Sequence, residues 1–132
     1  MFTVVAGIDK NENRAAAVAD AIESLPGEDE TEVVLVHSFT DNPEGASVDQ
    51  IGTIRRVRER LEAEEIDVQL DGRSGDPATT LLEAATEYDA DLVAVGARER
   101  SPAGKAVFGS VTQSVILEGD RSVLVCTAGD FE

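Results

Sequence analysis

The clearest chemical signal in the sequence lies in its last third. Between residues 92 and 117, three cations, Arg98, Arg100 and Lys105, stand against one carboxylate, Glu99, in a chain whose formal net charge is −16. This segment leads to Gly109-Ser110-Val111, where apolar spacing predicts the start of a helix. Free N–H groups and the helix dipole favour an anion at such a terminus. We therefore expect an anion to bind here; the alternative is that the cations pair with carboxylates and that Gly109-Ser110 only caps the helix.

Other candidate residues follow apolar runs elsewhere in the chain. Asp9 follows the first run, and its carboxylate can accept a hydrogen bond from a ribose hydroxyl or an adenine amino group, or cap the next turn. We also expect Lys10 beside it to reach a phosphate or ribose. Ser38 stands near the end of a second run and Gly96 closes a later one. Whether these residues meet depends on the elements that carry them.

Sharper enzyme motifs are excluded. A G-x-x-x-x-G-K-[ST] phosphate loop around Gly104-Lys105 would need Gly at 99 and Ser or Thr at 106, which hold Glu and Ala. A receiver domain would need a Lys after the fifth strand, and none follows Cys126. A triad hydrolase needs a positioned base, but the single histidine, His37, lies in an apolar strand and is expected in the core or on a dimer surface. Cys126 is expected to be buried and inert, so we expect neither catalytic residues nor a metal site.

Strands and helices alternate along the chain. Apolar, β-branched runs predict five strands, at residues 2–8, 32–39, 67–73, 92–95 and 122–126. Helical spacing predicts helices between most of them, with Asn11 or Asn13 capping the first and Asp76-Pro77 starting another. This order indicates an α/β fold with one parallel sheet and helices on both faces. The alternating pattern of residues 67–73 favours an edge strand. Ligands bind beyond the carboxyl ends of such strands, where the candidate residues stand.

Composition excludes several classes of partner. Hydrophobic residues make up 42% of the 132 residues, enough for one domain with a buried core. With 27 acidic and 11 basic residues, the chain repels nucleic-acid phosphates and anionic lipids. No apolar run approaches the roughly 20 residues that span a bilayer, and no signal-peptide pattern is present, so we expect a cytoplasmic protein. The acid excess, with nine Arg and two Lys, favours a halophilic source; an ordinary acidic protein is the alternative.

The glycine pattern of residues 96–111 resembles the nucleotide-binding motif of the universal stress protein family. That motif reads Gly, two residues, Gly, nine residues, Gly, then Ser or Thr. Gly96, Gly109 and Ser110 match it, whereas Glu99 replaces the second glycine. Further matching features lie along nearly the whole chain: Asp9, Val36-His37, Gly75-Asp76-Pro77 and the VLV run at residues 123–125.

The resemblance implies a fold and a ligand. The fold is a single Rossmann-like universal stress protein domain over residues 1–132, with sheet order 3-2-1-4-5, usually as a dimer. Some members of the family bind ATP and others do not. In the binders, residues matching Asp9 and Ser38 flank the adenosine, Gly96 allows close approach, and phosphates are held at the start of the last helix. The residues expected to bind ATP or a related adenine nucleotide, with or without Mg²⁺, are Asp9, Ser38, Gly96, Arg98, Gly109, Ser110 and Val111.

Glu99 separates three functional hypotheses. A carboxylate 5 Å from a phosphate costs roughly 3 kcal/mol at an effective dielectric of 20, offset in part by salt and by the neighbouring cations. The leading hypothesis is a dimeric stress-response regulator that binds the nucleotide weakly and is not an efficient enzyme. The second is a nucleotide-free interaction module with an unknown protein partner. The third is a slow ATPase or autokinase with Ser110 or a loop serine as phosphoacceptor.

The fifth predicted strand runs from Ser122 to Cys126 and is apolar almost throughout. In the implied order it lies at the edge of the sheet, and an exposed apolar edge favours association. Pairing with a second copy across a two-fold axis would produce a homodimer. The alternative is that the C-terminal tail covers this edge.

Overall fold

The computed structural model describes residues 1–40, 45–97 and 109–127. Within them, five strands form one parallel sheet in the order β3-β2-β1-β4-β5, as predicted. The basic segment around Arg98, including Glu99, lies outside the described residues, as does the tail after residue 127.

The elements match the predicted ones closely, and strand ends shift by one residue. The strands are β1 (Phe2–Gly7), β2 (Thr31–Phe39), β3 (Asp67–Ser74), β4 (Leu92–Gly96) and β5 (Val123–Cys126). The helices are α1 (Glu12–Glu23), α2 (Gly52–Ala63), α3 (Pro77–Glu87) and α4 (Ser110–Glu118), with short 3₁₀ turns η1 (Glu28–Glu30) and η2 (Val48–Gln50).

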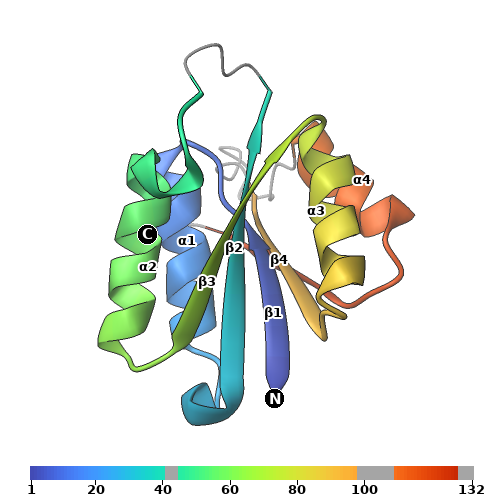
Figure 1. The fold of residues 1–132 in the computed structure, drawn as a ribbon. Coiled ribbons are helices and arrows are strands. Elements are labelled where there is room, and N and C mark those ends of the chain that lie inside the picture. Colours follow the sequence, from blue (N-terminus) through green and yellow to red (C-terminus); the bar gives the residue numbers. More distant parts are fainter. Residues whose placement is uncertain (41–44, 98–108, 128–132) are drawn as a thin grey trace, which may run out of the picture.

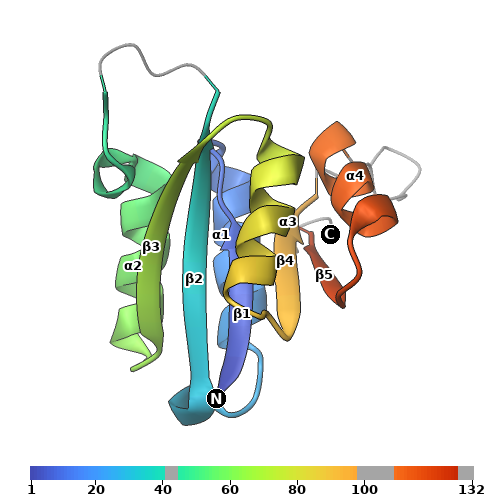
Figure 2. The ribbon, with the colours of Figure 1, turned by 45° about the vertical axis from the view of Figure 1, so that its right-hand side comes forward.

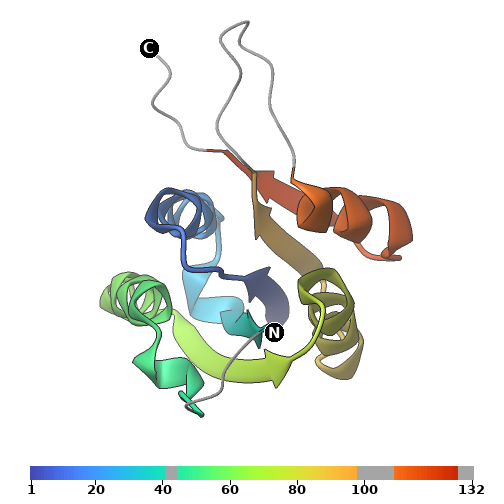
Figure 3. The same cartoon turned by 90° about the horizontal axis from the view of Figure 1, so that it is seen from above.

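Helices cover both faces of the sheet. In Figures 1 and 3, α1 and α2 lie on one side, and α3 and α4 on the other. The side chains of β1 alternate between two cores: Val4 and Ala6 pack with α1 and α2, whereas Val5 packs with α3 and α4. All three are fully buried, which explains why this strand reads as a continuous apolar run.

Local sequence signals set the helix starts. The Asn11 side chain accepts a hydrogen bond from the N–H of Arg14, so Asn11, and not Asn13, caps α1. Asp76 accepts from the N–H of Thr79 at 3.0 Å, and Pro77 occupies the first position of α3, as predicted. At α4, Gly109 is the N-cap and Ser110 is the first helical residue, so the Ser110 side chain does not cap the helix. Among the described residues, no side chain caps the first turn of α4.

The two edges of the sheet differ in chemistry. β3 is an edge strand, as its alternating pattern predicted, and its Arg73 pairs with Asp71 at 3.0 Å and with Glu87. β5 forms the opposite edge beside α4 (Figure 2), and Val123 and Leu124 there are half-buried. Among the described residues, no helix is long and apolar enough to cross a membrane.

Candidate functional site

A cavity of about 250 Å³ opens where the carboxyl ends of β1 and β4 meet the first turns of the helices. This is the point where the strand order reverses, the usual ligand position in open α/β sheets. Its floor is apolar and its rim polar. The described residues that line it are Gly7, Ile8, Asp9, Arg14, Val36, His37, Ser38, Pro77, Thr80, Leu81, Val95, Gly96, Gly109, Ser110, Val111 and Thr112. Six of the seven predicted site residues are therefore neighbours; the seventh, Arg98, lies outside the described residues.

The Asp9 carboxylate caps the turn that leads into α1. Its Oδ1 accepts from the N–H of Asn11 at 2.9 Å, and its Oδ2 accepts from Nε of Arg14 at 2.8 Å. The side chain remains 52% exposed. The turn-capping alternative is thus present in the structure, and an ion pair between Asp9 and Arg14 accompanies it.

Gly96 is required by the packing of α1 against β4. A Cβ at this position would lie 2.9 Å from Cβ of Arg14, closer than real Cβ contacts, and 3.1 Å from its carbonyl oxygen, a tight contact. The carbonyl of Gly96 accepts a hydrogen bond from Oγ1 of Thr112 in α4 at 3.1 Å. Gly96 therefore contacts α1 and α4, two of the three helices that contribute residues to the cavity.

Ser38 is held by the turn between β3 and α3. Its Oγ donates to the carbonyl of Gly75 at 2.8 Å and lies 3.1 Å from Oγ1 of Thr80. Because its proton is used, the Ser38 hydroxyl can offer a ligand only an oxygen lone pair. Thr80 was missed because the sequence gives no sign of which α3 residue lies against β2.

His37 is 5% exposed, so the expected burial in the core is confirmed. Its Nδ1 lies 2.8 Å from the carbonyl of Ile8, which requires a proton on Nδ1. The ring also stacks edge-on against Phe39. Nε2 has no protein partner among the described residues, and His37 is one of the residues that line the cavity.

The first turn of α4 supplies hydrogen-bond donors. Helix geometry leaves the N–H groups of Ser110, Val111 and Thr112 without an intrahelical acceptor, and no acceptor meets them within the described chain. These groups carry the positive end of the helix dipole and line the cavity. They can bind a phosphate or another anion without a metal.

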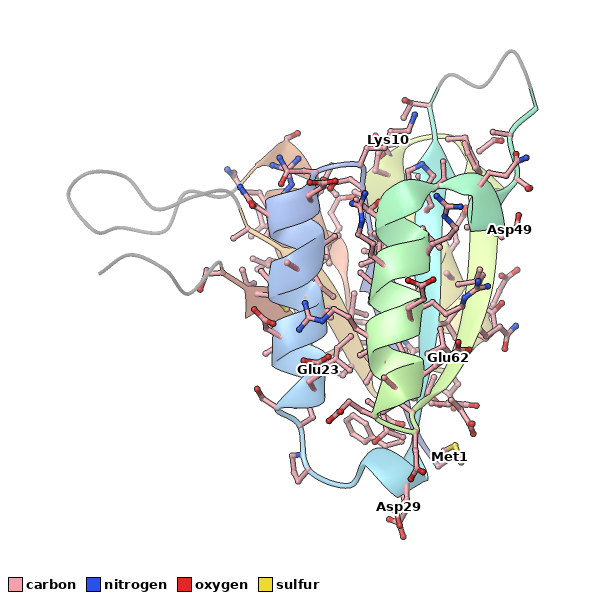
Figure 4. All side chains as sticks on the ribbon, turned by 90° about the vertical axis from the view of Figure 1, so that its left-hand side faces the viewer. Met1, Lys10, Glu23, Asp29, Asp49 and Glu62 are labelled. Carbon is pink, nitrogen blue, oxygen red and sulfur yellow. The ribbon has the colours of Figure 1, made fainter. Side chains whose placement is uncertain are left out.

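Two other polar candidates do not reach the cavity. Lys10 is exposed at the end of the sheet where β1 stops (Figure 4) and is absent from the cavity lining. Cys126 is buried as predicted, and burial raises the pKa of its thiol to about 12. Among the described residues, no cluster of three His, Cys, Asp or Glu side chains could hold a metal ion.

Residues 1–127 match the family described as the universal stress protein family. The chain belongs to this family. The chain is 30% identical to a universal stress protein of Mycolicibacterium smegmatis over 129 residues, covering 97% of the chain and 99% of that protein. It is 32% identical over 72 residues to the stress response protein NhaX of Bacillus subtilis, covering 54% of the chain but only 43% of NhaX.

Solved universal stress proteins share the fold. The crystal structure of a universal stress protein in complex with cAMP superposes with a TM-score of 0.74 at 25% identity, covering 96% of this chain and 97% of the other. The predicted Rossmann-like fold and the predicted family are therefore confirmed.

Proposed function

We propose that this universal stress protein binds ATP or a related adenine nucleotide in the cavity and acts as a cytoplasmic stress-response regulator. The observation that carries the proposal is the convergence of an apolar floor with free donors. The floor includes Val36, Leu81 and Val95, and the donors are the N–H groups at the start of α4. An apolar pocket with a few convergent polar groups is typical of small-molecule sites.

The chemistry around the cavity matches the two halves of a nucleotide. Oδ1 of Asp9 is an acceptor for the adenine amino group or a ribose hydroxyl, and Oγ of Ser38 offers another lone pair. The N–H groups of Ser110 and Val111 suit a phosphate. Support also comes from the similar protein that was crystallised with cAMP.

We propose that the bound nucleotide is not turned over efficiently. A general base must be positioned against a water, and His37 is instead buried, with Nδ1 committed to the carbonyl of Ile8. Mg²⁺ would enter with the phosphates of ATP as a complex. Incorporation of labelled γ-phosphate into Ser110 would favour the autokinase hypothesis instead.

Nucleotide content and thermal stability test the proposal together. Protein purified without added nucleotide is denatured, and the supernatant is analysed for adenine nucleotides; a second sample is melted with and without Mg-ATP in molar KCl. We expect released nucleotide or a rise in melting temperature that grows with ATP concentration. Neither signal, together with binding by Glu99→Gly, would favour the nucleotide-free interaction module.

We also propose a homodimer formed through β5. Among the described residues, β5 pairs only with β4, and its side chains Val123, Leu124 and Val125 are half-buried. The β3 edge, in contrast, carries the charged Arg73 and Asp71. Natural edge strands use such charges against association, so the β5 edge is the one suited to pairing.

Matched lysine substitutions test the dimer. Val123→Lys places a charge on the β5 edge, and Gln69→Lys places the same charge on the exposed β3 edge. We expect light scattering to show a dimer for the natural chain and for Gln69→Lys, and a monomer or a dimer weakened at least tenfold for Val123→Lys. A monomeric natural chain would contradict the proposal.

Finally, we propose that the acid excess adapts the protein to concentrated salt. Sixteen net negative charges repel one another, and salt screens this repulsion within a few Å at molar concentration. The unfolding free energy is expected to rise between about 0.1 and 1 M KCl. A flat or falling curve would favour an ordinary acidic protein.

A further inference from the structure

We infer that Arg14 is the phosphate-binding and specificity-determining side chain of the cavity, and that Asp9 acts by holding Arg14. This inference rests on the proposed function and refines it. It gives Asp9 a positioning role through Oδ2, beside the acceptor role proposed above for Oδ1.

One edge of the Arg14 guanidinium is hydrogen-bonded to Asp9, and the other edge has no partner among the described residues. Its Nε donates to Oδ2 of Asp9 at 2.8 Å, which fixes one edge of the group. Nη1 and Nη2 have no partner in the described part of the chain; the side chain is 32% exposed, and Arg14 is one of the residues that line the cavity. A guanidinium with one edge anchored and the other free suits the paired oxygens of a phosphate.

The backbone places Arg14 opposite the first turn of α4. Gly96 lies against Cα, Cβ and the carbonyl of Arg14 on one side, and its own carbonyl accepts from Thr112 of α4 on the other. Helices α1 and α4 therefore both contact Gly96. A phosphate beside Gly96 would face the Arg14 guanidinium and the N–H groups of Ser110 and Val111 together.

Charge balance in the cavity gives Arg14 a second effect. Among the described lining residues, Asp9 and Arg14 are the charged ones, and His37 is a further titratable group. Without Arg14, the Asp9 carboxylate would face an incoming phosphate unpaired and repel it. Arg14 both removes that repulsion and supplies donors, so its loss should affect phosphorylated ligands and leave adenosine unaffected.

Isothermal titration of adenosine, AMP and ATP into three proteins tests this inference. Arg14→Gln removes the charge but keeps the Cβ and backbone that contact Gly96, so the fold should be retained. We expect AMP and ATP to bind Arg14→Gln about 30-fold more weakly than the natural chain, and adenosine to bind within about twofold. The matched control is Arg56→Gln, which removes an exposed cation that pairs with Glu12 outside the cavity and should change none of the affinities.

Two further variants separate ligand binding from structural support. Arg14→Lys keeps the charge but loses the planar fork, so its loss for ATP should be intermediate. Asp9→Asn combined with Arg14→Gln removes the unpaired carboxylate, and ATP affinity should recover in part relative to Arg14→Gln alone. An Arg14 that only supported the fold would give no such recovery.

The outcomes distinguish this inference from the proposed function. If the natural chain binds ATP and Arg14→Gln keeps the same ratio of ATP to adenosine affinity, the role of Arg14 is wrong and nucleotide binding stands. If the natural chain binds neither adenosine nor any phosphorylated form, the proposed function fails and this inference fails with it.

Discussion

The two ends of the sheet carry hollows of opposite electrostatic character. At the carboxyl end, Asp9 is paired with Arg14, and the start of α4 adds N–H donors that no acceptor in residues 1–40, 45–97 or 109–127 meets. At the amino end, a hollow of about 440 Å³ is lined by carboxylates, and no cation is among its described lining residues. Those carboxylates belong to Glu32, Glu62, Glu65 and Asp67. Figure 4 shows Glu62 toward the end of the molecule opposite Lys10. The amino-end hollow has the size for a ligand, but its carboxylates would repel a phosphate.

The parallel topology explains this asymmetry. Each β–α unit places its helix N-terminus at the carboxyl end of the sheet and its helix C-terminus at the amino end. The dipoles consequently add positive potential to one end and negative potential to the other. The acidic residues of the amino end add to the same sign. An anion is thus directed to the carboxyl end in a chain that repels anions almost everywhere else.

Adding one carboxylate to each end gives the largest expected effect. Ser110→Glu places a negative charge at the start of α4, and Gln69→Glu places one beside the amino-end hollow that Gln69 lines. We expect Ser110→Glu to weaken ATP binding at least tenfold, with an upper bound near the roughly 3 kcal/mol of a carboxylate 5 Å from a phosphate. Its unfolding free energy should hold or rise, because an acid favours a helix N-terminus.

Titration calorimetry and urea denaturation measure these two quantities. Gln69→Glu should leave ATP affinity unchanged. Equal losses for the two variants would mean that total charge, and not the position of the charge, governs binding.

Two glycine substitutions give the next effect, with opposite signs. Gly96→Ala forces a Cβ against Arg14 and should lower the unfolding free energy by about 1–3 kcal/mol and weaken ATP binding. Gly52→Ala, at the start of α2, meets only the flexible end of Arg56 at 3.9 Å and should stabilise the protein by about 0.5–1 kcal/mol. Urea denaturation compares them. A Gly96→Ala protein as stable as the natural one would contradict the close contact between β4 and α1.

The smallest effect is expected at the amino end, where Glu65 adopts φ +64° after the end of α2. The N–H of Ile66 bonds to the carbonyl of Leu61 at 3.1 Å, which makes Glu65 the left-handed residue of a helix C-cap. Glu65→Gly should therefore stabilise the protein by about 1 kcal/mol without changing ATP affinity. Glu65→Gln, which removes the same charge and keeps the Cβ, separates the backbone effect from the electrostatic one in the same denaturation experiment.

Sequence reasoning reached most of the fold because its signals are local or periodic. Burial of β1 on both faces produces an unbroken apolar run, and Asp76-Pro77 specifies a helix start within two residues. The site was only partly predictable. Asp9, Ser38 and Gly96 were expected at strand ends, but the pairing of Asp9 with Arg14 depends on how the first turn of α1 lies against Gly96. The sole signal for Arg14 was its place in the first turn of the predicted helix after Asp9.

The most direct test follows backbone amide signals in a ¹H–¹⁵N spectrum during titration with ATP. Signals of Gly96, Ser110 and Val111 should shift with a common affinity, together with Nε–H of Arg14. Those of Glu32, Glu65 and Asp67 at the opposite end should stay in place. Shifts confined to the acidic end, or no shifts at any ATP concentration, would contradict a phosphate site between Arg14 and the start of α4.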